Sequence, residues 1–223
     1  MSKLIVIEGT DCSGKETQTN LLIERLQKEN KKVKRYSYPS YDTPTGKIVG
    51  GPYLGKDYIC KGYFEEGASN VDPKVASAYY AADRRYNLPI INKYLNDGYD
   101  VVIDRYVTSN MAHQGGKIKD KKERQAMFKW LEELEYGLFE LPRPDLTIFL
   151  HMPTEYALKL KENREEKADQ HESDINHLQN AEATYLELAK LYDFKTIECV
   201  ENKRIKSIEE IHEEVIAIFK EVE

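Results

Sequence analysis

The chain has few cysteines, no surplus of positive charge and no long apolar run. Its three cysteines, Cys12, Cys60 and Cys199, are an odd number without metal-ligand spacing, which argues against a disulfide framework and fits a reduced cytosol. The 33 Lys and Arg are outnumbered by 39 Asp and Glu, so no basic surface is available to bind nucleic acid by counterion release. No signal-peptide pattern and no membrane-length apolar segment occur. We therefore expect a soluble, cytoplasmic protein with neither nucleic acid nor membrane as a partner.

Short apolar runs alternate along the chain with segments of helical periodicity. The runs predict strands over residues 4–7, 32–37, 100–104, 146–150 and 195–200. The periodic segments predict helices over 17–26, 73–98, 121–138, 178–191 and 208–219, the second capped by Asp72 and ended by Gly98. A short helix should begin at Pro44 and break at Gly50-Gly51-Pro52. The length and this alternation predict one α/β domain over residues 1–223, with a five-stranded parallel sheet, helices on both faces and ligands beyond the carboxyl ends of the strands.

The first strand is followed directly by a loop framed by two glycines. The spacing G-x-x-x-x-G-K, with a strand before it and a helix after it, is typical of a loop whose backbone N–H groups hold phosphate. A chance glycine loop is the alternative. The pattern predicts that a nucleotide is bound by residues of this loop and of the following turn: Gly9, Thr10, Asp11, Cys12, Ser13, Gly14, Lys15, Glu16 and Thr17.

One position of this loop departs from the pattern. Glu16 stands where Ser or Thr would offer a hydroxyl to magnesium, and Thr17 follows one place later. Three interpretations stay open: Thr17 supplies the hydroxyl, Glu16 acts through a water molecule, or the affinity for the metal is changed.

Two arginines beside carboxylates are candidates for holding a second anion. Arg105 follows Asp104 at the end of the third predicted strand, and Arg84 follows Asp83 inside the long predicted helix. Strand-end charges above a parallel sheet face the ligand crevice in most folds of this class. The alternatives are a surface pair for Asp83 with Arg84, and a structural bridge for Asp104 with Arg105.

From residue 3 to about 200 the chain resembles thymidylate kinases, which transfer a phosphoryl group from ATP to dTMP. The most specific match is Asp104-Arg105-Tyr106 followed by Ser109, Ala112, Gln114 and Gly115. The other matching pieces occur in the family order: Glu8-Gly9-Thr10-Asp11 with Gly14-Lys15, Tyr38-Pro39 ahead of Gly46, Tyr80 to Arg84, Pro144 to Thr147, and Arg164 with Asp169, Glu172 and Tyr185.

The resemblance implies a kinase fold of the P-loop NTPase type with a lid over about residues 159–173. On the donor side it implies that Lys15 and the loop amides hold the ATP phosphates and that Asp104 lies beside Mg²⁺, with Thr17 and Glu16 as further candidates for the metal. Arg164, in the lid, would stabilise the charge of the transition state. Lys15, Arg105, Arg164 and Asp11 are thus the expected catalytic residues.

On the acceptor side the resemblance implies a site for dTMP. It places Asp11 at the 3′-hydroxyl, Tyr80 against the thymine ring, Arg84 on the base edge, Arg105 near the phosphate, and Ser109 and Gln114 around the nucleotide. It also implies a homodimer formed through the long helices.

Two departures and three alternatives accompany this interpretation. Tyr41 stands near a position where many relatives have a phosphate-binding arginine. His151 replaces a commoner aspartate, and a hydrogen-bonded histidine at a strand end is a simpler explanation than a catalytic one. The alternative activities are a deoxynucleoside kinase, a kinase for another monophosphate, and a nucleotide-binding regulatory protein that has lost its transferase activity. Arg84 and Arg105 favour a monophosphate acceptor.

Overall fold

A five-stranded parallel sheet forms the centre of the protein, as the sequence predicts. The computed structural model describes residues 2–161 and 174–222. The strands lie in the order β2 (Val33–Ser37), β3 (Asp100–Asp104), β1 (Leu4–Gly9), β4 (Leu146–His151) and β5 (Lys195–Glu198), and each pairs in parallel with its neighbour. After β5 the chain forms a small antiparallel pair, β6 (Val200–Glu201) and β7 (Arg204–Ile205). The carboxyl ends of β1, β3 and β4 therefore open on one edge.

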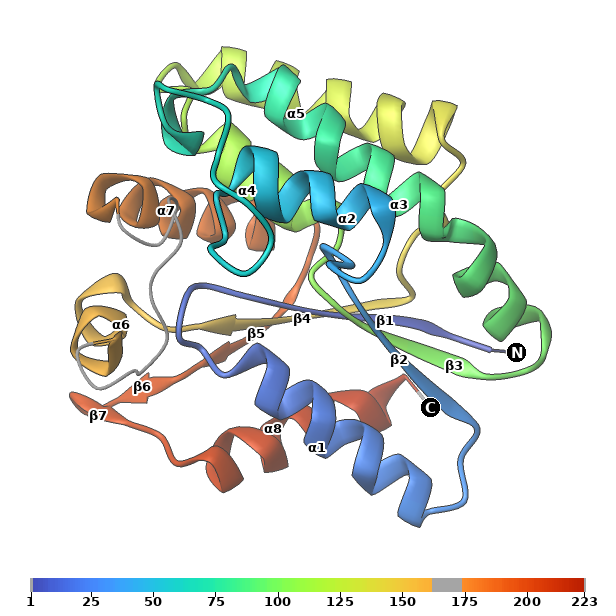
Figure 1. Cartoon of the computed structure of the whole chain (residues 1–223). Coiled ribbons are helices and arrows are strands. Elements are labelled where there is room, and N and C mark those ends of the chain that lie inside the picture. The colour runs from blue at the N-terminus through green and yellow to red at the C-terminus, as the bar shows by residue number, and fades with distance from the viewer. Residues whose placement is uncertain (1, 162–173, 223) are drawn as a thin grey trace.

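Helices cover both faces of the sheet (Figure 1). One face is covered by α1 (Lys15–Lys28) and α8 (Ile208–Glu221), and the other by α3 (Pro73–Asn96), α4 (Val107–Gly115), α5 (Lys121–Glu132) and α7 (Ile175–Leu191). The short α2 (Pro44–Ile48) packs on α3, and α6 (Thr154–Lys161) follows β4. Across the described residues, no helix is both long and apolar enough to cross a membrane.

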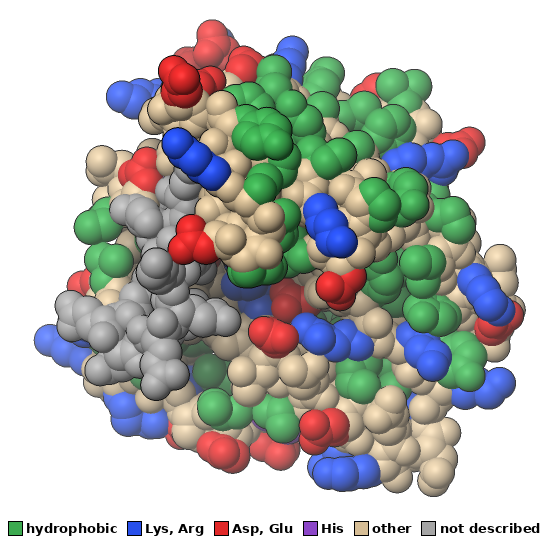
Figure 2. Space-filling model, viewed as in Figure 1, with side chains coloured by type: hydrophobic (Ala, Val, Ile, Leu, Met, Phe, Trp, Pro, Cys, Tyr) green, Lys and Arg blue, Asp and Glu red, His purple; other side chains and the backbone are tan. Residues whose placement is uncertain are grey.

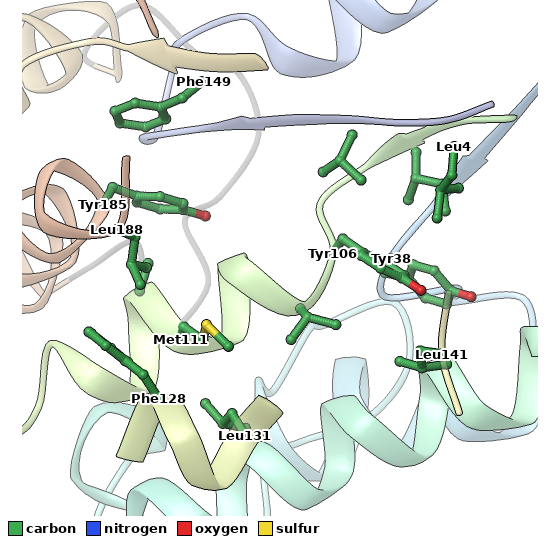
Figure 3. Close-up of a cluster of buried hydrophobic side chains, with 14 of the residues drawn as sticks. Leu4, Tyr38, Tyr106, Met111, Phe128, Leu131, Leu141, Phe149, Tyr185 and Leu188 are labelled. Carbon is green, nitrogen blue, oxygen red and sulfur yellow. The ribbon is translucent and has the colours of Figure 1, made fainter. Parts of the chain in front are cut away.

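An apolar core fills the space between the sheet and each helical layer. Figure 3 shows the larger cluster, where Phe149 of β4 stacks on Tyr185 of α7 with 5.2 Å between ring centroids. The second cluster joins β1 and β4 to α1 and α8. β1 is buried on both sides, and its residues from Leu4 to Ile7 are accordingly apolar at consecutive positions.

The short second helix does not break at its glycines and proline, contrary to the prediction. The chain continues as a widened helical turn, η1 (Val49–Tyr53), with Pro52 inside it. The helix continues because the backbone N–H groups after the proline still form hydrogen bonds within it. The N–H of Leu54 donates to Val49 O at 2.9 Å, and the N–H of Gly55 donates to Gly51 O at 2.8 Å. A second such turn, η3 (Glu133–Leu138), extends α5 to the end expected for that helix. A single 3₁₀ turn, η2 (Ala68–Asn70), precedes α3.

The long helix α3 begins and ends where the sequence predicts, but it faces the core with other residues. Asp72 caps it by accepting from the N–H groups of Lys74 and Val75, and Gly98 follows it in a left-handed conformation with φ of 81°. Most of the apolar residues whose spacing predicts the helix are exposed, namely Val75, Ala78, Ala82, Tyr86 and Ile90. The buried side is rich in polar residues: Ser77, Asp83, Arg84 and Asn87. Apolar periodicity failed here because this helix buries hydrogen-bonding groups.

Helix α4 was missed from the sequence. Eight of its nine residues are buried, among them Thr108, Ser109, Asn110 and Gln114, so no polar outer face marks it as amphipathic. It begins two residues after Arg105, which itself adopts a left-handed conformation with φ of 64°.

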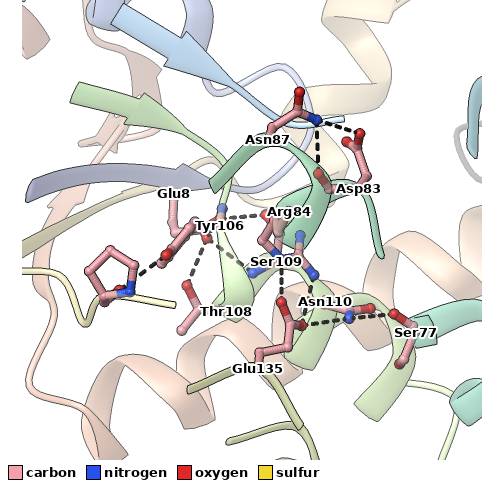
Figure 4. Close-up of polar contacts among 11 residues, drawn as sticks. Glu8, Ser77, Asp83, Arg84, Asn87, Tyr106, Thr108, Ser109, Asn110 and Glu135 are labelled. Atoms are coloured by element: carbon pink, nitrogen blue, oxygen red, sulfur yellow. Dashed lines mark hydrogen bonds and ion pairs between the residues drawn. The ribbon is translucent and has the colours of Figure 1, made fainter. Parts of the chain in front are cut away.

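The Glu8 carboxylate holds the N-terminus of α4 (Figure 4). Glu8 is fully buried on β1, and its Oε1 accepts from the N–H of Tyr106 at 2.9 Å, the N–H of Ser109 at 3.0 Å and the hydroxyl of Thr108 at 2.7 Å. Its Oε2 accepts from the hydroxyls of Ser109 at 2.6 Å and Tyr185 at 3.0 Å. A carboxylate at a helix N-terminus is stabilised by the unpaired N–H groups and by the helix dipole.

We expect Glu8→Gln to lower the free energy of unfolding by about 2–4 kcal/mol, because an amide NH₂ would face donors and the buried negative charge would be lost. Urea denaturation followed by circular dichroism measures the change. The matched control is Glu24→Gln, on the exposed side of α1, which should change the unfolding free energy by less than about 0.5 kcal/mol. Equal stabilities of Glu8→Gln and the unmodified protein would contradict the role given to this carboxylate.

Candidate active site

The glycine-framed loop between β1 and α1 is shaped to hold an anion. Gly14 has a left-handed conformation with φ of 79°, and a Cβ on Gly9 would come within 2.8 Å of the carbonyl oxygen of Leu150. The loop is attached to β4 through Thr10, whose hydroxyl donates to Met152 O at 2.7 Å and accepts from Met152 N–H at 2.9 Å. Gly14 has no side chain that could cap α1, so the first N–H groups of the helix are available to an anion.

The two cations predicted for the site lie on the same edge of the sheet. Ile7 of β1 pairs with Asp104 of β3, so the loops that carry Lys15 and Arg105 leave adjacent strands side by side. Asp11 lies between them, with its Oδ1 at 3.6 Å from Nη2 of Arg105. Lys15 is buried, and its ammonium donates to the carbonyl oxygen of Thr10 at 2.8 Å.

Electrostatics at these two cations favour the arrival of negative charge. Burial first, and then the nearby guanidinium of Arg105, lower the pKa of Lys15 to about 8. Burial alone would lower the pKa of Arg105, but Tyr185 and the carboxylates of Asp11 and Asp104 raise it, so Arg105 stays charged. A phosphate bound between Lys15 and Arg105 would relieve their repulsion.

A cavity opens beside these cations, between the sheet edge, the loop after β2 and the helices α3 and α4. In Figure 2 a hollow with both positive and negative side chains lies near the centre of the view. The cavity wall combines aromatic and polar side chains: Asp11, Tyr38, Pro39, Tyr41, Leu54, Tyr80, Arg84, Arg105, Ser109, Asn110 and His113. Five of the predicted acceptor residues are on this wall.

Arg84 faces the cavity, but its charge is already compensated from behind. Its Nε and Nη2 donate to the two carboxylate oxygens of buried Glu135, Nη2 at 2.8 Å (Figure 4). Glu135 also accepts from the amide of Asn110 at 3.1 Å. The coulombic attraction and hydrogen bonds of Glu135 raise the pKa of Arg84 although burial lowers it. A surface pair between Asp83 and Arg84 is thus wrong, because Arg84 is only 2 % exposed and bound to η3.

Asp83 instead fixes the loop that leads into α2. Its carboxylate accepts from Ser40 N–H at 2.9 Å, from the Thr45 hydroxyl at 2.8 Å and from the Asn87 amide at 3.0 Å. This loop carries Tyr38, Pro39 and Tyr41, so the bonds to Asp83 hold the aromatic side of the cavity against α3.

Of the remaining residues predicted to bind the acceptor, two line the cavity and one is buried behind its wall. Tyr80 lies on the cavity wall, edge-on to Tyr53 with 5.7 Å between ring centroids. Ser109 is also on the wall, although its hydroxyl is engaged with Glu8. Gln114 is fully buried behind the wall, where its Nε2 donates to the hydroxyl of Tyr53 at 3.5 Å. Contact of Gln114 with a ligand stays a prediction.

The three candidate metal ligands, Asp104, Glu16 and Thr17, differ in burial and in their hydrogen-bond partners. Asp104 is 9 % exposed, and its Oδ1 is buried with no hydrogen-bond partner in the described part of the chain, which suits a cation at this point. Burial raises the pKa of Asp104, while Lys15 and Arg105 oppose that rise. Glu16 is exposed and bound to Arg35 of β2, with 3.3 Å between Oε1 and Nη2, and Thr17 is exposed on α1. Asp104 therefore fits a divalent cation best.

His113 is the site residue that the sequence reasoning missed. It comes from α4, and it lines the main cavity as well as a smaller one between the phosphate loop and the helices α6 and α7. Asp11 also lines both, so the two cavities meet at these two side chains. The only signal in the sequence was its place one residue before Gln114, inside a helix that the periodicity did not reveal.

His151 has the structural environment that its simpler interpretation predicts. Its Nδ1 lies 2.6 Å from Glu198 Oε2, and its Nε2 lies 3.0 Å from Glu182 Oε1. Burial lowers the pKa of His151, but these two carboxylates raise it overall. Arg164, by contrast, lies outside the described residues, as does most of the predicted lid.

Comparison with known proteins agrees with this geometry. The family model described as thymidylate kinase matches residues 7–215. A thymidylate kinase of Schizosaccharomyces pombe is 27% identical over 99% of this chain and 92% of its own length. A probable thymidylate kinase of Saccharolobus solfataricus is 30% identical over 99% of this chain and 98% of its own length. A solved thymidylate kinase structure from Candida albicans superposes with a TM-score of 0.75 at 24% identity, covering 99% of this chain and 92% of that one. The chain thus belongs to the thymidylate kinase family.

Proposed function

We propose that the protein transfers the γ-phosphoryl group of ATP to dTMP and so produces dTDP. This proposal rests on one observation: Lys15, Asp11 and Arg105 lie on the same edge of the sheet. The phosphate loop and the aromatic cavity meet at this edge. Phosphoryl transfer needs two anionic substrates held in line and their charge compensated, and it needs little covalent chemistry from the protein.

On the donor side, the loop amides and Lys15 bind the phosphates of ATP. The proposal is supported by the positive φ of Gly14, by the uncapped start of α1 and by the burial of Lys15 near Arg105, which lowers the pKa of Lys15 and which a bound phosphate would offset. Asp104 would hold Mg²⁺, and Glu16 and Thr17 are the further candidates. When bound, this ion neutralises negative charge on the donor phosphates.

On the acceptor side, the cavity offers a distinct chemistry at each end. Tyr80 and Tyr38 provide aromatic surface for a base, and Arg84, held by Glu135, presents a fixed guanidinium edge. Arg105 at the other end, beside the phosphate loop, attracts the acceptor phosphate, and Asp11, on the same wall, is proposed to accept from a sugar hydroxyl. Ser109 and Gln114 complete the set proposed for the acceptor.

Two further parts of the proposal come from the family resemblance. Arg164 is proposed to stabilise the transition-state charge from the lid at about residues 159–173. A homodimer is proposed through α3, where exposed Val75, Tyr86 and Ile90 fall on one side of the helix because separations of 11 and 15 residues are close to whole turns. Hydrophobic side chains gather over this region at the upper right of Figure 2.

The proposed reaction is tested by ADP release with ATP and Mg²⁺ across dTMP, dUMP, dCMP, AMP and thymidine. We expect the highest kcat/KM with dTMP, because the cavity joins an aromatic wall to a cation at its phosphate end. Turnover of thymidine but not of dTMP would indicate a deoxynucleoside kinase, and preference for another monophosphate would change the substrate. ATP binding without turnover on any acceptor would indicate a regulatory protein.

Arg105→Ala should raise the KM for dTMP and lower kcat, so that kcat/KM falls by about 10²- to 10³-fold through the loss of a charge-assisted contact. Steady-state kinetics with dTMP as the varied substrate measures this. Arg85→Ala is the matched control, since Arg85 is an exposed arginine of α3 that binds Phe139 O and Glu140 at the surface. An unchanged kcat/KM in Arg105→Ala would refute the assigned role.

ATP binding should weaken above about pH 8. The pKa of Lys15 is lowered to about 8 in the protein without nucleotide, and bound phosphates raise it, so binding takes up a proton once the free ammonium has begun to deprotonate. The dissociation constant should be flat near pH 7 and then rise by up to about tenfold per pH unit. Titration calorimetry from pH 7 to 10 measures it, with Lys15→Arg as the control that should remove the rise. An equal rise in both proteins would exclude Lys15 as its source.

A further inference from the structure

Arg35 of β2 forms ion pairs with two carboxylates beside the candidate cation site. Its Nη2 lies 3.3 Å from Oε1 of Glu16 and 4.0 Å from Oδ2 of Asp104. Glu16 belongs to the first turn of α1, directly after Lys15, and Asp104 ends β3, the strand that pairs with β2. The guanidinium of Arg35 therefore connects three elements next to the phosphate loop.

The two contacts of Arg35 differ in kind. At 3.3 Å the guanidinium donates a hydrogen bond to Glu16, whereas 4.0 Å is too long for a hydrogen bond and leaves only coulombic attraction to Asp104. The two oxygens of Asp104 differ as well. Oδ2 is the one paired with Arg35, and Oδ1 is buried with no hydrogen-bond partner in the described part of the chain. Asp104 thus has one oxygen near the guanidinium and another that suits a cation.

The hydrogen bond to Glu16 determines which carboxylate the guanidinium approaches more closely. Within residues 2–161 and 174–222, Nε of Arg35 is buried and makes no hydrogen bond, so it does not hold the group in place. If Glu16 lost its charge, Asp104 would become the stronger attraction for Arg35. A guanidinium that moved closer to Asp104 would oppose the binding of a cation to this carboxylate.

Positive charge already surrounds Asp104. Burial raises the pKa of Asp104, and the charges of Lys15, Arg105 and Arg35 oppose that rise. A divalent cation at Asp104 must therefore bind close to three cationic side chains. The phosphates of a bound nucleotide would compensate Lys15 and Arg105, and Glu16 is placed to compensate Arg35.

The same ion pair removes a charge that would repel the donor phosphates. Glu16 lies in the first turn of α1, where the backbone N–H groups are available to an anion. An unpaired carboxylate at this position would repel phosphates bound there. Its side chain is 73 % exposed, so Arg35 neutralises it without taking it out of solvent.

We propose that Arg35 and Glu16 act as one neutral unit at the cation site, in which Glu16 is the counter-ion that keeps Arg35 away from Asp104 and is not itself a metal ligand. Both are positioning residues, and they leave Oδ1 of Asp104 to the divalent cation that accompanies the donor nucleotide. This pair takes the place of the hydroxyl that the loop pattern calls for at residue 16. The inference rests on the proposed function, since it needs a nucleotide bound together with a divalent cation.

The experiment measures how strongly Mg²⁺ promotes nucleotide binding. Titration calorimetry gives the Kd of AMP-PNP, a non-hydrolysable analogue of ATP, once in EDTA and once in excess Mg²⁺. The ratio of the Kd in EDTA to the Kd in Mg²⁺ is the measured quantity. The affinity of the free nucleotide for Mg²⁺ is the same in every titration, so a variant changes this ratio only by changing how the protein binds the ion.

Glu16→Gln should lower this ratio about threefold to tenfold, because Arg35 without its counter-ion opposes the cation. Arg35→Gln should raise the ratio about twofold to fivefold, because a competing positive charge is removed from Asp104. The double variant Glu16→Gln/Arg35→Gln should return to within about twofold of the unmodified protein, since the two changes act on one ion pair and compensate each other.

The matched control is an ion pair at the other end of the same helix. Arg25 and Glu29 of the α1 terminus are partly exposed, with 2.6 Å between Nε and Oε1. Arg25→Gln and Glu29→Gln make the same chemical changes far from the cation site and should leave the ratio unchanged. Arg35→Met is a second neutral variant that should behave like Arg35→Gln, and urea denaturation checks that each variant is folded.

Three results would overturn the proposal. If Glu16 is a metal ligand, the ratio in the double variant will be as low as in Glu16→Gln. If Arg35 supports Asp104 instead of opposing the cation, Arg35→Gln will lower the ratio. If the pair has no influence on the metal, both single variants will match the unmodified protein.

ADP release with dTMP separates failure of this inference from failure of the proposed function. If the unmodified protein phosphorylates dTMP but the variants do not follow the expected pattern, only the role of Arg35 and Glu16 is wrong. If the ratios follow the pattern but no monophosphate is turned over, the inference holds and the proposed function fails. If AMP-PNP does not bind to the unmodified protein, both fail.

Discussion

The buried carboxylate of Glu8 is the interaction on which the site depends. It accepts five hydrogen bonds, four of them from the first residues around the start of α4 and one from Tyr185 of α7. Glu8 belongs to β1, the strand that leads into the phosphate loop. Its side chain therefore connects that strand to the start of α4, directly after Arg105. The hydrogen bonds of Glu8 thereby fix the positions of the donor and acceptor sides relative to each other.

The charges of the site fall into two groups with different physical behaviour. Arg84 and Glu135 neutralise each other inside the protein, which gives a guanidinium of fixed orientation and avoids an unpaired buried charge. Lys15 and Arg105 are close enough to repel, and the carboxylates of Asp11, Asp104 and Glu8 oppose that repulsion. The remaining repulsion between these cations is relieved when phosphates bind. The arrangement of charges in the free protein therefore already favours anionic ligands.

Hydrogen bonds rather than apolar contacts decide how the cavity wall is built. Asp83 fixes the loop before α2, and Glu135 fixes Arg84 and Asn110, while α3 leaves Val75, Tyr86 and Ile90 outside. These polar contacts join segments that are 25 to 51 residues apart. A wall held in this way keeps directional groups at fixed positions, which recognition of a nucleotide requires.

The sequence by itself determined the five strands, most of the helices and the phosphate loop, because these depend on local periodicity and on the spacing of Gly9, Gly14 and Lys15. The family came from the resemblance of its motifs, above all Asp104-Arg105-Tyr106 and the residues that follow it. It also predicted that Arg105 lies beside the loop, since parallel strands end at a common edge. Only the tertiary structure decided that α4 exists, that Arg84 binds Glu135, that Gln114 is buried behind the wall and that His113 contacts both Arg105 and His177. These features depend on side chains brought together from distant segments, and the periodicity of one segment carries no information about its partners.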